Sequence, residues 1–129
     1  ANLRRKFGLR LHELRLGGAC AGDQIFCVGL PLMGGAVLEN EDRIPSPDDV
    51  VALLKCPGVH AVIPVGSRGI GDEARVLAGE SGLTVQWHTP AKVNLEQSAG
   101  PSSCVIIAAH KDDFSSRLSV PVFELGTLV

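Results

Sequence analysis

Short apolar segments separated by glycine, proline and polar residues recur along the chain. Segments bounded in this way and rich in aliphatic or β-branched residues are typical of buried β-strands. Four of them are predicted to be strands, at residues 24–30, 59–65, 102–109 and 120–126. Residues 83–87 alternate apolar and polar side chains and predict a further strand. Pro121 indicates an edge position for the last strand, because proline has no N–H group to donate to a neighbouring strand.

Two segments between these strands are predicted to be helices. Ser46 is placed to cap a helix that starts at Pro47 and is stopped by Pro57 and Gly58. Residues 72–79 put small and aliphatic side chains on one face of a second helix, with acidic residues in its first turn. Two shorter helices are expected within residues 94–98 and 110–118. The alternation of strands and helices predicts an α/β (α+β) fold, in which helices pack on a mixed sheet.

The composition fits one domain with an aliphatic core. The 129 residues include four Phe, one Trp and no Tyr, which argues against an aromatic surface for single-stranded nucleic acid. The formal net charge of −2 provides no overall positive field to attract nucleic acid or an anionic membrane. Basic residues gather near the start of the chain, and we interpret them as a solvated or partner-facing segment: Arg4, Arg5, Lys6, Arg10 and Arg15.

The cysteines and histidines do not form a recognisable metal-binding motif. No two cysteines have the C-x-x-C spacing, and Cys27 and Cys104 lie inside apolar strands, as small core residues do. The histidines are dispersed, without partners at metal-ligand spacing: His12, His60, His88 and His110. We therefore expect reduced thiols and no metal site. The sequence also has no signal sequence and no long apolar stretch. Together with the reduced thiols, these features favour a cytoplasmic protein without a membrane partner.

The strongest candidate for chemistry is a glycine-rich turn between the strand at 59–65 and the helix that follows it. Its residues are Gly66, Ser67, Arg68, Gly69 and Gly71. Small residues there let backbone N–H groups approach a phosphate at the positive end of the helix dipole, and a hydroxyl and a guanidinium could add hydrogen bonds. The glycines could equally serve positive φ angles and close packing, with the arginine in solvent. On spacing alone, both interpretations stay open.

Four segments resemble the C-terminal domain of the aminoimidazole ribonucleotide (AIR) synthetase-related superfamily. Residues 58–85 are similar to its strand, glycine-rich turn, helix and Ser-Gly-Val progression. Residues 22–31 resemble its Gly-Asp opening, residues 98–108 its Ser-Gly-strand motif, and residues 120–126 its closing Val-Pro strand. The superfamily includes selenophosphate synthetase, thiamine-monophosphate kinase and a hydrogenase maturation protein. Among its members, AIR-synthase-related proteins proposed as α-ribazole kinases share the V-G-S-[KR]-G-I and S-A-G-P-[SA]-[ST]-C motifs.

This resemblance implies a domain at residues 22–129 with an AIR synthetase C-terminal-domain-like fold, preceded by a basic segment at residues 1–21. The implied function is the substrate- and phosphate-side part of an ATP-dependent kinase or synthetase, with a small phosphorylated substrate and a link to cobalamin biosynthesis. Members bind ATP and Mg²⁺ through an N-terminal domain that supplies metal-binding aspartates, and this sequence does not contain that domain. The acidic residue of the family's turn is also replaced, by residues 65–68.

We therefore expect the chain to be catalytically incomplete without an N-terminal nucleotide-binding domain or subunit, and a homodimer is a further expected partner. The alternative is a stand-alone module that binds a small anion or a protein and has no enzymatic activity.

Overall fold

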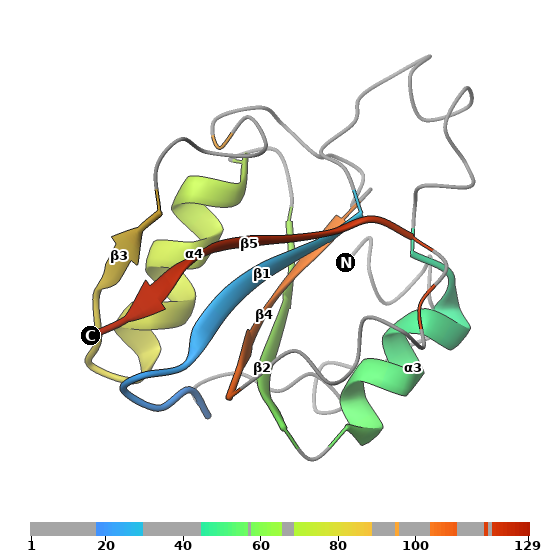
Figure 1. Ribbon diagram of the computed structural model, residues 1–129, viewed down its shortest axis with the longest axis horizontal. Coiled ribbons are helices and arrows are strands. Elements are labelled where there is room, and N and C mark those ends of the chain that lie inside the picture. The colour runs from blue at the N-terminus through green and yellow to red at the C-terminus, as the bar shows by residue number, and fades with distance from the viewer. Residues whose placement is uncertain are drawn as a thin grey trace.

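The computed structural model describes residues 18–29, 45–56, 58–65, 69–88, 95, 104–110, 118 and 120–129. The helices and strands in these ranges follow the order β1 (Gln24–Gly29), α3 (Pro47–Lys55), β2 (Val59–Pro64), α4 (Gly69–Glu80), β3 (Val85–Trp87), β4 (Cys104–Ala109) and β5 (Val122–Leu128) (Figure 1). The five predicted strands and the two main helices are confirmed. Neither helix is long and apolar enough to cross a membrane. The basic cluster and most of the two shorter predicted helices lie outside the described residues.

The strands form one sheet in the order β2-β4-β1-β5-β3. All four pairings are antiparallel, whereas the sequence predicted a mixed sheet. The helices do link strands of the same direction, since α3 joins β1 to β2 and α4 joins β2 to β3. However, β4 lies between β1 and β2, and β5 lies between β1 and β3. The later strands separate the parallel ones, so no two parallel strands are neighbours within the described sheet.

The expected edge position of the last strand is wrong, because β5 pairs with β1 on one side and β3 on the other. Pro121 stands just before the strand, and its carbonyl accepts a hydrogen bond from the Gly29 N–H at 2.8 Å. Its missing N–H therefore falls outside the ladder and leaves the pairing of β5 intact.

Two helices cover opposite faces of the sheet, and alternate residues of each strand point to one or the other. On β4, Ile106 is buried with α4, and Ile107 is buried with α3. The core between the sheet and α4, here called the α4-face core, includes the helix residues Ile70, Ala74, Leu77 and Ala78. The core between the sheet and α3, the α3-face core, includes Val50 and Leu53 of α3 and Cys56, which follows the helix. In Figure 1, α4 lies behind β5 and β1, while α3 lies beside β2.

Local signals determine where α3 starts. The Ser46 hydroxyl accepts a hydrogen bond from the Asp49 N–H at 3.1 Å, and the Asp49 carboxylate accepts one from the Ser46 N–H at 2.9 Å. This reciprocal capping box satisfies two N–H groups at the helix end, with aspartate in the place usually taken by glutamate or glutamine. The predicted cap at Ser46 is confirmed.

Gly18 and Ala19, the first of the described residues, pack against the sheet and its core. Ala19 is buried in the α4-face core, and a side chain at Gly18 would place its Cβ 2.5 Å from the His60 carbonyl oxygen. The packed part of the chain therefore includes residues on the N-terminal side of the domain boundary expected at residue 22.

Candidate functional site

The turn proposed from the sequence lies between the end of β2 and the start of α4. Gly66, Ser67 and Arg68 lie outside the described residues, so their contacts remain predictions. Gly69 is buried and has a φ of +86°, a conformation that residues with a side chain rarely adopt. Helix α4 begins at this glycine, three residues before the predicted start at Asp72. Glycine is a poor helix former, and burial of residues 69–71 overrides that preference.

Gly71 has a packing role in the first turn of α4. Its N–H donates a hydrogen bond of 2.7 Å to the carbonyl of Leu95, and an added Cβ would lie 3.3 Å from that oxygen. Because this amide already has a partner, an anion at the helix N-terminus would have to be bound by other groups. For Gly71, the geometry favours close packing over direct contact with a ligand.

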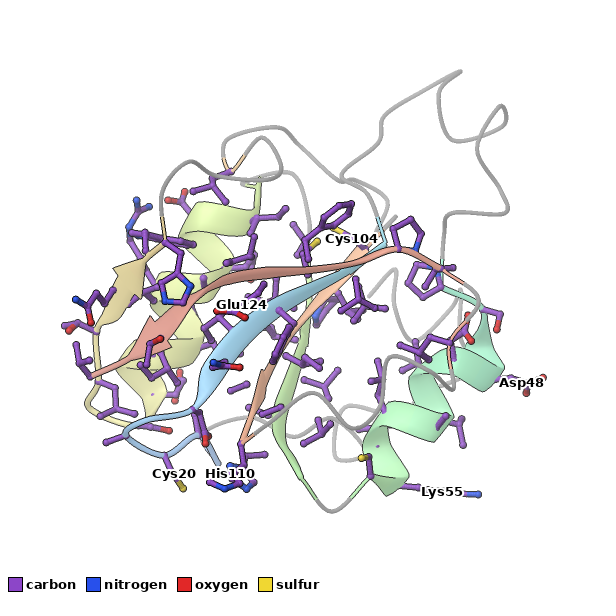
Figure 2. The ribbon with its side chains drawn as sticks, in the orientation of Figure 1. Cys20, Asp48, Lys55, Cys104, His110 and Glu124 are labelled. Carbon is purple, nitrogen blue, oxygen red and sulfur yellow. The ribbon has the colours of Figure 1, made fainter. Side chains whose placement is uncertain are left out.

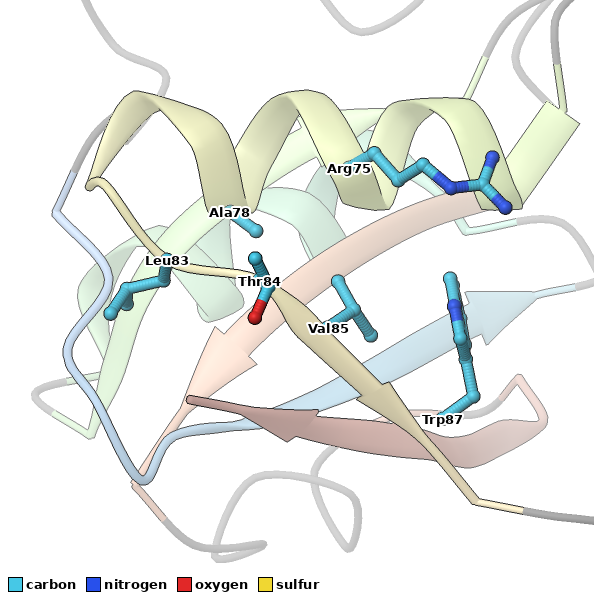
Figure 3. Close-up of a pocket in the computed structure, with 6 residues that line it drawn as sticks. All are labelled: Arg75, Ala78, Leu83, Thr84, Val85 and Trp87. Atoms are coloured by element: carbon cyan, nitrogen blue, oxygen red, sulfur yellow. The ribbon is translucent and has the colours of Figure 1, made fainter.

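An open pocket of about 330 Å³ lies between α4 and β3 (Figure 3). Its lining residues are Arg75, Ala78, Leu83, Thr84, Val85 and Trp87. Arg75 makes an exposed ion pair with Asp72, with 3.0 Å between Nη1 and Oδ1, and such pairs contribute little to stability. The pocket therefore combines an apolar wall, the indole of Trp87 and a cation on its rim. This composition suits a small ligand with an apolar part and an anionic group.

Three polar side chains that the sequence did not connect lie together before β1 and at the start of β2. Asp23 is 2% exposed. Its Oδ2 accepts a hydrogen bond from the Cys20 N–H at 2.8 Å and lies 2.7 Å from His60 Nδ1. One potential ligand atom from each of Cys20, Asp23 and His60 lies within 4.8 Å of the other two. His60, which has no partner at metal-ligand spacing in the sequence, therefore has both a carboxylate and a thiol as neighbours in the fold.

Comparison with solved structures finds similar folds at low sequence identity. E. coli HypE, a hydrogenase maturation protein, matches with a TM-score of 0.64 and 16% identity, over 88% of this chain and 45% of that chain. AaThiL complexed with AMPPCP and TMP matches with a TM-score of 0.57 and 17% identity, over 86% of this chain and 46% of that chain. No protein family profile and no curated protein matches the sequence. Both similar structures are AIR synthetase-related proteins, as the sequence motifs suggested.

The chain has the fold of the AIR synthetase-related superfamily. It spans just under half the length of the two AIR synthetase-related proteins that it matches. At these identities the likeness establishes the fold alone, and the roles of individual residues rest on the geometry of this chain.

Within this AIR synthetase-related fold, a polar cluster lies over β5 and beside the end of β3, on the face of the sheet that α3 covers elsewhere. His88 Nδ1 lies 2.8 Å from the Glu124 carboxylate, and His88 Nε2 lies 3.0 Å from the Thr127 hydroxyl. Figure 2 shows Glu124 on the sheet at a distance from α3. Both ring nitrogens of His88 thus have a partner, so the imidazole is held in one orientation at the surface.

The prediction that Cys27 and Cys104 are core residues is confirmed, because both are fully buried and neither forms a disulfide. A hydrogen bond with Cys104, burial and the nearby Cys104 charge all raise the pKa of the Cys27 thiol well above its usual value. The thiolate form of Cys27 is therefore disfavoured, which makes this buried thiol unsuited to nucleophilic chemistry. Cys20 is exposed, and Figure 2 shows it at the end of the sheet opposite Cys104.

Proposed function

We propose that this chain is the C-terminal, substrate- and phosphate-side part of an ATP-dependent AIR synthetase-related enzyme. The observation that carries the proposal is the fold, which matches just under half of two larger AIR synthetase-related proteins over most of this chain. One of them is complexed with AMPPCP, an ATP analogue, and TMP. The proposed reaction is transfer of the γ-phosphoryl group of ATP, in which positioning and charge neutralisation do most of the catalytic work.

The substrate side of this proposal is the turn between β2 and α4. Ser67 and Arg68 follow a buried edge strand and precede a helix, where a phosphate would meet the positive end of the helix dipole. The buried Gly69, with its positive φ, gives the backbone a sharp change of direction at this point. The motifs shared with α-ribazole kinase-like proteins make α-ribazole the first substrate to test.

The nucleotide side of the proposal lies outside this chain. Mg²⁺ in phosphoryl-transfer enzymes is held by carboxylates together with substrate phosphates. Several described carboxylates are already engaged within the chain: Asp49 with the α3 cap, Asp72 with Arg75 and Glu124 with His88. This supports a division of labour in which an N-terminal nucleotide-binding domain or subunit supplies ATP, Mg²⁺ and the acidic ligands.

The chain alone is expected to show no Mg²⁺-dependent ATP hydrolysis and no phosphorylation of α-ribazole, because it lacks the nucleotide side. The same chain joined to a nucleotide-binding domain, or mixed with a separate nucleotide-binding subunit, is expected to turn over ATP with a small-molecule acceptor. Radiolabelled phosphoryl transfer from ATP measures both. Sustained turnover by the pure chain, abolished by one substitution, would overturn the proposed division. A failure of every longer form to use ATP would favour a binding module without catalysis.

Arg68→Ala and Gly69→Val are expected to separate a ligand role of the turn from a backbone role. Losing the guanidinium should weaken phosphate binding by about 1.5–3 kcal/mol, the range for charged hydrogen bonds, and leave the melting temperature almost unchanged. Gly69→Val should lower the melting temperature, because valine is strained at a φ of +86°. Titration calorimetry with inorganic phosphate and thermal unfolding measure the two effects. Unchanged phosphate binding in Arg68→Ala would remove Arg68 from the proposed site.

A further inference from the structure

We propose that Cys20, Asp23 and His60 bind a divalent metal ion of the zinc class, at the end of the sheet opposite the β2–α4 turn. The three side chains provide a thiolate sulfur, a carboxylate oxygen and an imidazole nitrogen, and these are the donors that zinc takes in proteins. A magnesium or calcium site would instead be built from oxygen donors. The mixed donor set therefore selects the chemical class of the ion.

The distances between the donors fit such an ion. In a tetrahedral zinc site, bonds of about 2.0–2.3 Å place neighbouring donor atoms about 3.3–3.7 Å apart. The three donor atoms here already lie within 4.8 Å of one another, and the Asp23–His60 pair is closer, at 2.7 Å. An ion at the centre would replace the hydrogen that His60 and Asp23 share, and those two donors would move apart by less than about 1 Å. No rearrangement of the strands is needed.

The surrounding backbone holds the three donors in place. The Asp23 carboxylate accepts the Cys20 N–H, and the Asp23 N–H donates to the Cys20 carbonyl at 3.0 Å. The Asp23 carbonyl and the Gly22 N–H both bond to Leu128 at the end of β5, each at 2.8 Å. Gly18 lies directly against the His60 carbonyl, where any side chain would collide. The segment before β1 is thereby fixed beside β2, which reduces the entropy lost when a metal binds.

The site is open on one side, which suits an ion that keeps a position for water or another ligand. Asp23 is buried, His60 is 30% exposed and Cys20 is exposed. Zinc sites with three protein ligands leave the fourth position to solvent or substrate, whereas structural sites are closed by four. The cluster lies before β1 and at the start of β2, whereas the proposed phosphate turn follows the end of β2. The two sites share no residue, so one can fail without the other.

The test uses the purified chain, stripped of metal with a chelator and titrated with Zn²⁺ or Co²⁺. We expect one equivalent to bind, and bound Co²⁺ to give a thiolate charge-transfer band. Cys20→Ser should remove the band and weaken Zn²⁺ binding at least tenfold, and His60→Ala should weaken it at least tenfold as well. Cys20 is exposed, so its serine variant should keep the fold, which circular dichroism checks. His88→Ala, at a second histidine–carboxylate pair, is the matched control and should bind like the parent chain.

Two results would overturn the proposal. One is the absence of saturable one-to-one Zn²⁺ binding by the folded parent chain. The other is binding that survives both Cys20→Ser and His60→Ala with unchanged affinity, which would place the ion elsewhere. Neither result bears on phosphate binding at Arg68 or on ATP turnover, so failure here is distinguishable from failure of the proposed function.

Discussion

Gly126→Ala is expected to destabilise the protein by about 3 kcal/mol, the upper end of the usual range for overpacked sites. Gly126 lies in β5 opposite Trp87 of β3. An added Cβ would be 2.5 Å from the Gln86 carbonyl oxygen and 3.2 Å from the Trp87 Cα. Both neighbours are backbone atoms of β3, so no side chain can move aside to relieve the collision. The whole edge strand must shift away from β5.

Chemical denaturation followed by circular dichroism measures the loss, and the fluorescence of Trp87, the chain's one tryptophan, reports on β3 separately. The matched control is Gly79→Ala on α4, where an added Cβ meets nothing within 4 Å. That substitution should stabilise the protein by about 0.5–1 kcal/mol, because alanine is the better helix former. If Gly126→Ala were as stable as the parent chain with unchanged Trp87 emission, the close pairing of β3 with β5 would be refuted.

Features encoded by neighbouring residues could be predicted from the sequence. The α3 start follows from Ser46 and Pro47 and from the cap that Asp49 completes three residues on. Four strands were visible as apolar segments between turn residues, and β3 was visible as an alternation of apolar and polar side chains, because each pattern depends on the strand's own side chains. The motifs at residues 22–31 and 58–85 also indicated the superfamily whose fold the structure has.

The pairing of strands could not be predicted, because it depends on segments far apart in the chain. The insertion of β4 between β1 and β2, and of β5 between β1 and β3, makes every described pairing antiparallel. No local pattern in β1 or β2 signals which strand will lie beside it. The mistaken edge assignment of β5 has a related cause, since Pro121 affects pairing only if it lies within the ladder.

The candidate sites divide in the same way. The β2–α4 turn was recognised from contiguous residues, although the structure assigns Gly71 to packing against Leu95. The grouping of Cys20 and Asp23 with His60 was missed because it joins residues 37 positions apart, through a close approach of Gly18 to β2. The spacing of Cys20 and Asp23, three residues apart in a turn, was the local sign. Without the fold, His60 could not be placed beside them.

Ile106→Ala and Ile107→Ala are each expected to cost about 2–5 kcal/mol, because both side chains are fully buried and truncation leaves a cavity. The residues are adjacent on β4 but point to opposite faces, Ile106 into the core under α4 and Ile107 into the core under α3. If only one face of the sheet were covered, one of the two side chains would be exposed, and its truncation would reduce stability only slightly. Similar large losses at both positions would therefore establish that both faces are packed.

Denaturant unfolding of the two variants measures these losses, with Val76→Ala as the control. Val76 is on α4 but is 37% exposed, so its truncation should change stability by no more than about 0.5 kcal/mol. A loss below about 1 kcal/mol at either isoleucine would mean that the corresponding face is not covered as the structure has it. The variant with the smaller loss of stability would then identify the misplaced helix, which is α4 for Ile106→Ala and α3 for Ile107→Ala.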